Sequence, residues 1–267
     1  MRKFFGKYRG KVSAVADPLN LGRIRVQVPS VFGAERNSWA LPSVPYAGKD
    51  IGFFTVPPVG SNIWVEFEEG NPDYPIWSGC FWGKDELPQY AKVEQQDKVQ
   101  VFRTHGMTLT LSNLENKKGL TIEVESPTVE RKLKMIFNAE GIEINNKDET
   151  TIKIKADIIE LKNRANSTVT LTADTIQLKE SSTETKLTAT TIDLICNPAT
   201  VKLSSASGIE LNNSPASTKL NSTGIELSVA APSVKLTPAQ IELSNAAANI
   251  KLSPVTVNVN NGALEVI

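Results

Sequence analysis

The amino-acid sequence predicts an all-β fold in two parts, a small N-terminal barrel followed by a long repetitive β-helix or β-prism. Strand-like runs separated by turn residues fill the first 90 positions, and from residue 169 to residue 266 an apolar–charged–apolar phrase returns about every eight residues. A third observation supports the division, because fifteen of the seventeen aromatic residues lie in the first 90 positions. Only the first part therefore has the side chains for a compact aromatic core.

The first part is typical of a five-stranded barrel. Strand signals cover residues 11–15, 23–28, 51–56, 63–67 and 76–80. The connections contain Asp-Pro, Pro-Pro, Gly and Asn-Pro, which end strands because they restrict the backbone or allow it to turn. Five short strands over about 80 residues favour an OB-type barrel. We expect its core to form around Trp39, Trp64, Trp77 and Trp82.

The repeat that follows is one short strand and one turn. In each phrase, such as Val201-Lys202-Leu203 or Ile209-Glu210-Leu211, alternation places the two apolar residues on one face and the middle residue on the other. A unit of about eight residues cannot bury its own apolar face, so neighbouring units must stack into a shared core. This requirement predicts the β-helix or β-prism.

The middle residues of the phrases alternate in charge. They are Lys186, Asp193, Lys202, Glu210, Lys219, Glu226, Lys235, Glu242 and Lys251. One chain coiled with two units per turn would stack like charges about 4.8 Å apart, which destabilises a sheet. Three chains winding about one axis would instead place every Lys beside an acidic residue of another chain. A single chain with three units per turn would alternate equally, and the plain alternative is a set of solvated exterior charges.

The expected organisation is therefore an OB-fold domain at residues 1–90, a linker and β collar at 91–141, and an intertwined triple-stranded β-helix at 142–267. The linker is polar, and we expect a short helix near residues 86–96. The collar carries strand signals at residues 107–111, 120–124 and 133–137 with longer polar connections.

Composition argues against several functions. The net charge is zero, with 29 basic and 29 acidic side chains, whereas nucleic-acid-binding proteins usually carry a basic surplus. His105 is the single histidine, no nucleophile motif accompanies it, and we expect no cofactor, metal site or catalytic residue. Glu66 and Glu68 are expected on a strand exterior, and Cys80 and Cys196 as small buried residues. Without a signal-peptide core or membrane span, we expect cytoplasmic synthesis as a soluble protein.

An ordered series of short motifs in residues 7–83 resembles a known family. The series is Gly10-Lys11-Val12, Asp17-Pro18, Gly22-Arg23-Ile24-Arg25-Val26, Trp39-Ala40, Pro58-Val59-Gly60, Ile63-Trp64-Val65-Glu66-Phe67-Glu68, Gly70-Asn71-Pro72 and Pro75-Ile76-Trp77-Ser78-Gly79. It is similar to the OB domain of phage baseplate assembly protein V and related central spike proteins of contractile injection systems. These spikes typically continue into a triple-stranded β-helix, so the resemblance extends to the second part.

The resemblance implies a trimer attached to a baseplate hub protein at the OB end. Its apex would be at the C-terminal end, where we place Leu264, Val266 and Ile267, with a small PAAR-like tip protein as a candidate partner. Some relatives bind iron through a His-x-His pair at the tip, and this sequence lacks that pair. Others carry a lysozyme domain before the β-helix, and here that interval is too short to hold one.

We therefore expect a structural, non-enzymatic spike of a contractile tail or tail-like injection particle that punctures a target membrane mechanically. Two alternatives belong to other classes: an OB-fold nucleic-acid-binding protein with a β-solenoid stalk, and a glycan-degrading tailspike. The balanced charge argues against the first, and the absence of aromatic residues after Phe137 argues against the second. Sequence does not distinguish a phage from a bacteriocin or a secretion apparatus.

Overall fold

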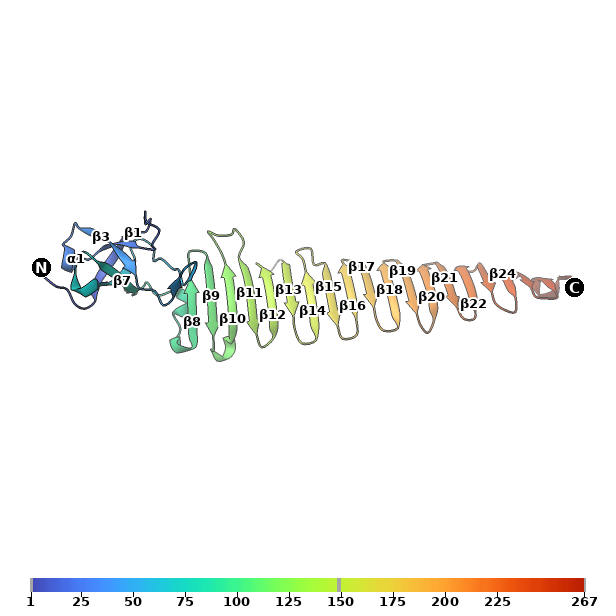
Figure 1. The fold of residues 1–267 in the computed structure, drawn as a ribbon. Coiled ribbons are helices and arrows are strands. Elements are labelled where there is room, and N and C mark those ends of the chain that lie inside the picture. Colours follow the sequence, from blue (N-terminus) through green and yellow to red (C-terminus); the bar gives the residue numbers. More distant parts are fainter. Residues whose placement is uncertain (1, 148–149, 267) are drawn as a thin grey trace. The chain divides into compact units, whose positions relative to one another are not determined.

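The structure is a computed structural model that describes residues 2–147 and 150–266. It divides into two compact units, residues 1–92 and residues 93–267, which are described separately below. Strands dominate both units (Figure 1), so the predicted all-β class is confirmed.

The first unit is a closed five-stranded barrel. Its strands are β1 (Tyr8–Ala14), β2 (Ile24–Gln27), β3 (Asn37–Pro42), β6 (Asn62–Phe67) and β7 (Pro75–Cys80). They pair in the order β1-β2-β3-β7-β6, and β6 pairs back onto β1. All pairs are antiparallel except β3 with β7. The smaller elements are α1 (Pro29–Phe32), β4 (Ala47–Gly48), β5 (Ile51–Gly52), η1 (Glu68–Gly70) and η2 (Gln89–Ala91).

One expected barrel strand is wrong. Residues 51–56 do not enter the barrel, and β3 takes that place instead. The segment runs into Pro57-Pro58, and proline has no N–H to donate to a sheet. Within β3, by contrast, Ala40 is fully buried between two more exposed neighbours, which is the alternation of a half-buried strand.

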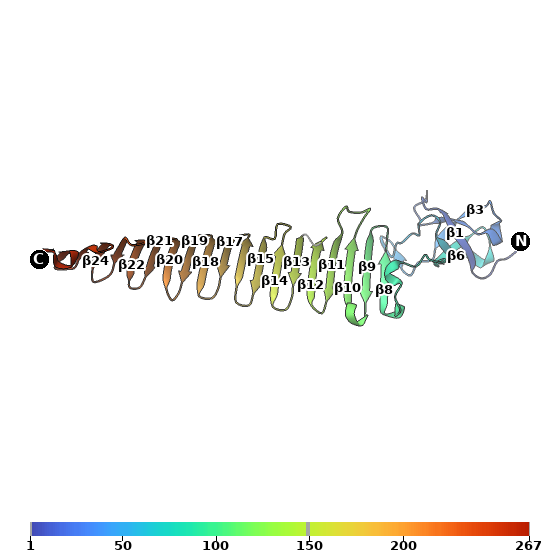
Figure 2. The ribbon, with the colours of Figure 1, turned by 180° about the vertical axis from the view of Figure 1, so that it is seen from behind.

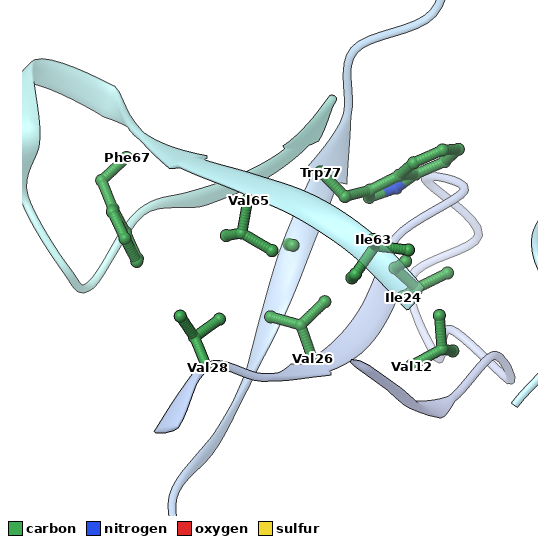
Figure 3. Packing of buried hydrophobic residues seen from close by; sticks show 9 residues of the cluster. Val12, Ile24, Val26, Val28, Ile63, Val65, Phe67 and Trp77 are labelled. Atoms are coloured by element: carbon green, nitrogen blue, oxygen red, sulfur yellow. The ribbon is translucent and has the colours of Figure 1, made fainter. Parts of the chain in front are cut away.

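The barrel core is mainly aliphatic (Figure 3). It consists of Val12, Ile24, Val26, Val28, Ala40, Ile63, Val65, Phe67 and Trp77. Each large side chain buried here contributes about 1.5–3 kcal/mol. The expected core around four tryptophans is wrong for three of them: Trp82 is 65% exposed, and Trp39 and Trp64 are only half-buried. Trp64 follows the buried Ile63 and precedes the buried Val65, so strand alternation turns it outward.

The second unit is one long antiparallel sheet (Figures 1 and 2). Its strands are β8 (Val99–Arg103), β9 (Met107–Ser112), β10 (Gly119–Val124), β11 (Leu133–Asn138), β12 (Gly141–Asn146), β13 (Thr150–Ile154), β14 (Ile158–Lys162), β15 (Thr168–Thr172), β16 (Ile176–Glu180), β17 (Thr183–Leu187), β18 (Thr191–Cys196), β19 (Ala199–Ser204), β20 (Gly208–Asn213), β21 (Ala216–Asn221), β22 (Gly224–Val229), β23 (Ser233–Leu236), β24 (Ile241–Asn245), β25 (Ala248–Leu252), β26 (Val257–Val259) and β27 (Leu264–Val266). The 3₁₀ turns are η3 (Gln96–Lys98), η4 (Glu115–Lys117) and η5 (Asn260–Gly262). The short helix expected near residues 86–96 is replaced by the 3₁₀ turns η2 and η3.

Each strand of this sheet pairs with the next strand of the same chain. The pairing is antiparallel from β8–β9 through β26–β27. This differs from the expectation that the neighbours of a strand come from other chains. The reason is the length of the connections, because two to four residues separate consecutive strands from β19 to β25, and such short links join antiparallel neighbours.

Glycine makes two of these tight links possible. Gly208 and Gly224 have φ values of +85° and +150°, which side chains rarely adopt. A Cβ atom at either position would also collide with a backbone carbonyl oxygen, that of Leu220 or that of Leu236. The strands have four to six residues from β8 through β25, and only β26 and β27, with three residues each, are shorter.

Candidate assembly surface

Alternation gives the long sheet one apolar face. Two rows of side chains, apolar except for Thr218, cross its strands, and we call them column A and column B. From β18 to β26, column A contains Ile192, Leu203, Ile209, Leu220, Ile225, Leu236, Ile241, Leu252 and Val257. Column B contains Leu194, Val201, Leu211, Thr218, Leu227, Val234, Leu243, Ile250 and Val259. The cross-strand register thus joins the predicted three-residue phrases into one surface.

The apolar face is uncovered in the single chain. Leu211 and Leu227 are 45% and 44% exposed, and the residues of column A are 36–43% exposed. The smaller side chains of column B, Val201, Thr218, Val234 and Val259, are partly buried. Isolated exposed apolar residues are normal on proteins, but a continuous apolar patch of this length marks an interaction site. The sheet therefore needs a partner on this face to form a dry core.

The apolar face is hollowed on the side of column B. An apolar groove of about 950 Å³ extends over β19 to β26, between residues 199 and 260. A second groove of about 530 Å³ lies over β13 to β17. The outer border of the first groove is a third row, column C, which contains Ala199, Asn213, Ala216, Val229, Asn245 and Ala248.

The opposite face carries the predicted charge row. In the register, Lys186, Asp193, Lys202, Glu210, Lys219, Glu226, Lys235, Glu242 and Lys251 oppose one another in sequence on consecutive strands. Lys219 Nζ lies 3.2 Å from a Glu210 carboxylate oxygen, and the pairs Lys235–Glu226 and Lys251–Glu242 are separated by 3.3 and 3.5 Å. Each half-exposed pair contributes about 0.2–1 kcal/mol.

The charge row differs from the sequence expectation in two ways. Its partners lie within one chain, because the hairpins bring consecutive phrases together. The row is also longer, since Glu143, Lys153 and Glu160 occupy the same positions on β12, β13 and β14. The two positions of the row between Glu160 and Lys186 are occupied by uncharged residues, Thr170 and Gln177. The signal was present in the phrases Ile142-Glu143-Ile144 and Ile152-Lys153-Ile154.

Hydroxyl pairs lie beside the charge row on the same face. Ser217 Oγ and Ser228 Oγ are 2.8 Å apart, and Ser233 Oγ and Ser244 Oγ are 2.7 Å apart. These small polar side chains satisfy one another across adjacent strands. The outer face is thus polar throughout this region, so the two faces of the sheet differ sharply in chemistry.

The predicted apex lies at the narrow end of the sheet. Leu264 is 60% exposed and begins β27, which also contains Val266, whereas Ile267 lies outside the described residues. Asparagine side chains hold the turn before β27: the Asn258 carboxamide oxygen accepts a hydrogen bond from the backbone N–H of Gly262, and that of Asn260 accepts one from the backbone N–H of Asn249.

The barrel presents apolar side chains on two adjacent segments, residues 17–23 and 46–54, which together we call the barrel loop surface. Leu19, Leu21 and Phe54 are 61%, 55% and 79% exposed. The segments adjoin, because a Cβ added at Gly22 would lie 3.6 Å from the Phe54 ring. The barrel thus has its own candidate contact region.

Asp17 fixes the first of these segments. Its carboxylate accepts hydrogen bonds from the backbone N–H groups of Leu19, Leu21 and Arg23, and from the Arg23 guanidinium at 2.7 Å. The guanidinium also lies over the Trp39 ring, 5.4 Å from its centroid. The Arg23 side chain, helped by the backbone donors, holds the pKa of Asp17 well below its usual range.

The residues considered for catalysis are scattered. His105 is exposed between β8 and β9, and Glu66 forms an ion pair with Lys7 at 3.1 Å. Cys80 and Cys196 are exposed, so the expectation of buried cysteines is wrong. No three or more His, Cys, Asp or Glu side chains in residues 2–147 and 150–266 gather into a group that could hold a metal ion. Over the same residues, no helix is long and apolar enough to cross a membrane.

Comparison with known proteins finds a matching family model for each end of the chain. Residues 8–82 match the family model described as the type VI secretion system/phage-baseplate injector OB domain. Residues 197–265 match the phage baseplate V C-terminal trimerisation domain. The second match covers almost the same strands as the larger apolar groove.

Curated relatives from Vibrio cholerae serotype O1 are similar over short stretches. The actin cross-linking toxin VgrG1 is 32% identical over 87 residues, which are 31% of this chain and 8% of that protein. The type VI secretion system spike protein VgrG3 is 30% identical over 89 residues, which are 32% of this chain and 9% of that protein. The matches span less than a tenth of the length of either relative.

Proposed function

Since this chain belongs to the family of phage baseplate V and related injection-system spike proteins, we propose that three copies form the central spike of a contractile injection particle. The observation that carries the proposal is the uncovered apolar face, which lies over the strands matched by the trimerisation domain. Three such faces turned toward a common axis would bury columns A and B, and the charge rows would remain in water.

We extend the proposal to mechanical puncture of a target membrane, which the same architecture supports. The sheet has nineteen strand-to-strand steps from β8 to β27. At about 4.8 Å each, they give a length on the order of 90 Å. Every step is a ladder of backbone hydrogen bonds, and most steps from β12 to β25 add apolar and charged cross-strand pairs, which suits a rod under compression. Contraction elsewhere in the particle would supply the force.

We also propose that the barrel attaches the spike to a baseplate hub protein. The barrel loop surface supports this part of the proposal, because Leu19, Leu21, Tyr46, Phe53 and Phe54 are all more than half exposed. Aromatic and aliphatic groups held on an ordered scaffold are the usual anchors of protein interfaces. We place a small PAAR-like tip protein, where one is present, on the narrow end around Leu264.

The proposed role is structural. The similarity to VgrG1 lies in a region that makes up 8% of that protein, so its actin cross-linking activity is not carried over. The central spike is assembled into the particle and acts by position and rigidity, without turning over a substrate.

One observation favours a second function, the binding of single-stranded nucleic acid. On the barrel exterior the Arg9 guanidinium lies 5.7 Å from the Trp64 ring centroid and 5.4 Å from that of Phe81. Aromatic rings beside basic groups stack unpaired bases. Titration with a labelled single-stranded oligonucleotide at low salt tests this function. The balanced charge of the chain leads us to expect no saturable binding, and saturable binding would support this second function.

The test of the spike proposal is the mass of the full chain by light scattering. We expect three chains in the wild type and a single chain in Leu227→Asp, because a carboxylate in column B would be buried without a partner at a cost of about 3–5 kcal/mol. Ser228→Asp is the matched control, because Ser228 follows Leu227 on β22 and strand alternation turns its side chain to the opposite face, where its hydroxyl contacts that of Ser217. A monomeric wild type, or a trimeric Leu227→Asp, would overturn the proposal.

A further inference from the structure

The apolar face of the sheet is asymmetric from side to side. On β21, the residues that share this face are Ala216 in column C, Thr218 in column B and Leu220 in column A. On β25 the corresponding residues are Ala248, Ile250 and Leu252. Column A is therefore built of Leu, Ile and Val, whereas column C is mostly Ala and Asn. The groove lies on the side of column C.

We propose that column A of each copy packs into the groove between columns B and C of the next copy, so that the three copies interlock head to tail around the axis. The inference rests on the proposed trimer and specifies how its chains meet. The occupant of the groove is a second copy of this chain, because the groove spans residues 199–260 and the trimerisation match spans residues 197–265.

The two strips match in shape and chemistry. Large aliphatic side chains on one border would enter space left open by alanine on the other, and close packing favours such alternation of large and small residues. An interface made from two different strips of one surface is heterologous, and a heterologous contact closes into a ring when the rotation permits. The long sheet thus carries both halves of the contact.

Threefold symmetry sets which residues meet. In a trimer whose threefold axis runs along the direction in which the strands stack, each strand of one copy lies level with the same strand of the other two. The column A end of β21 in one copy therefore faces the column C end of β21 in the next. Leu220 should therefore lie beside Ala216 of the neighbouring copy. If column A lay close to the threefold axis instead, the three copies of Leu220 would meet one another, and the experiment below distinguishes that arrangement from this one.

Cysteine cross-linking of the full chain tests this contact. In a Cys80→Ser, Cys196→Ser background, Ala216→Cys and Leu220→Cys are introduced separately and together. A short bismaleimide joins two thiols by addition across its two double bonds. Within one strand the two positions are roughly 13 Å apart, beyond the reach of the shortest such reagents. We expect a covalent trimer on a denaturing gel only from the double variant.

The outcomes separate this inference from the proposed function. Dimers from Leu220→Cys alone would show that column A meets column A, and a trimeric double variant that fails to cross-link would equally overturn the inference. Either result leaves the spike proposal standing. A wild type that is not a trimer would overturn the spike proposal itself.

A second variant reads the same contact without cross-linking. Ala216→Leu fills the groove where column A of the next copy would enter. We therefore expect the dissociation constant of the trimer to increase at least tenfold. Ala206→Leu is the control, because this substitution adds the same volume and Ala206 is exposed in the turn between β19 and β20. Equal trimer stability in the two variants would overturn the inference.

Discussion

At the scale of single residues, Asp17 shows how one carboxylate can fix a functional segment. It receives three backbone N–H donors and the Arg23 guanidinium, and Arg23 is held in turn over Trp39. This arrangement sets the shape of the segment that carries Leu19 and Leu21. The sequence marked Asp17-Pro18 as a turn, but the guanidinium partner depends on side-chain geometry that no local signal contains.

We expect Asp17→Asn to lower the melting temperature of the barrel, because the amide places a donor where the carboxylate accepts from Leu21 and Arg23. Tryptophan fluorescence reports the barrel alone, since all four tryptophans lie in residues 1–90. Asp73→Asn is the control, because Asp73 forms an exposed ion pair with Arg36 at 2.7 Å. An equal effect of the two substitutions would contradict the prediction.

The lowered pKa of Asp17 gives this contribution a pH dependence. A carboxylate with a depressed folded-state pKa adds stability at pH values above its unfolded pKa, about 3.9, and loses it as the pH falls toward the folded value. The difference in melting temperature between wild type and Asp17→Asn should therefore be constant from pH 7 to pH 5. It should shrink below about pH 4, as measured by fluorescence melts.

At the scale of elements, the three-residue phrase predicted each strand and both of its faces. It did not decide which strands pair. Lys219 meets Glu210 and Glu226 in a meander of one chain, and a three-chain winding would have given the same alternation of sign. The connection lengths settle the matter physically, since links of two to four residues leave the next strand no other place to pair.

The charge row predicts a specific cost for reversal. Lys219→Glu places like charges beside Glu210 and Glu226, and we expect it to destabilise the sheet by roughly 1–2 kcal/mol at low salt. Lys219→Gln, which removes attraction without adding repulsion, should cost less. Circular-dichroism melts at low and high salt separate the two, because added salt should recover part of the loss only in the glutamate variant.

The tight links predict a second element-scale effect. Gly224→Ala should destabilise the sheet by roughly 1–3 kcal/mol, because its Cβ would meet the Leu236 carbonyl oxygen at a left-handed backbone position. Gly262→Ala is the control: Gly262 also has a positive φ, +105°, but an added Cβ there meets nothing within 4 Å. Denaturant unfolding of the two variants should show the larger loss for Gly224→Ala.

At the scale of the whole molecule, the apolar columns make the stability of the sheet depend on association. If three copies share one core, the melting temperature of the sheet must rise with protein concentration. We expect that rise in the circular-dichroism transition across a hundredfold dilution series. Leu227→Asp should abolish it, and a concentration-independent transition in the wild type would contradict a shared core.

The two-strand hairpin also sets how the length of this molecule can change. Residues 208–211 and 224–227 are both Gly-Ile-Glu-Leu, so removal of residues 208–223 would join the same turn to the same strand start and leave Lys202 opposite Glu226. The sheet would shorten by roughly 10 Å. Loss of β20 alone would reverse the chain direction and bring Lys202 beside Lys219. The length of such a sheet can therefore change only by whole strand pairs. Insertions or deletions that survive selection should come in multiples of about sixteen residues.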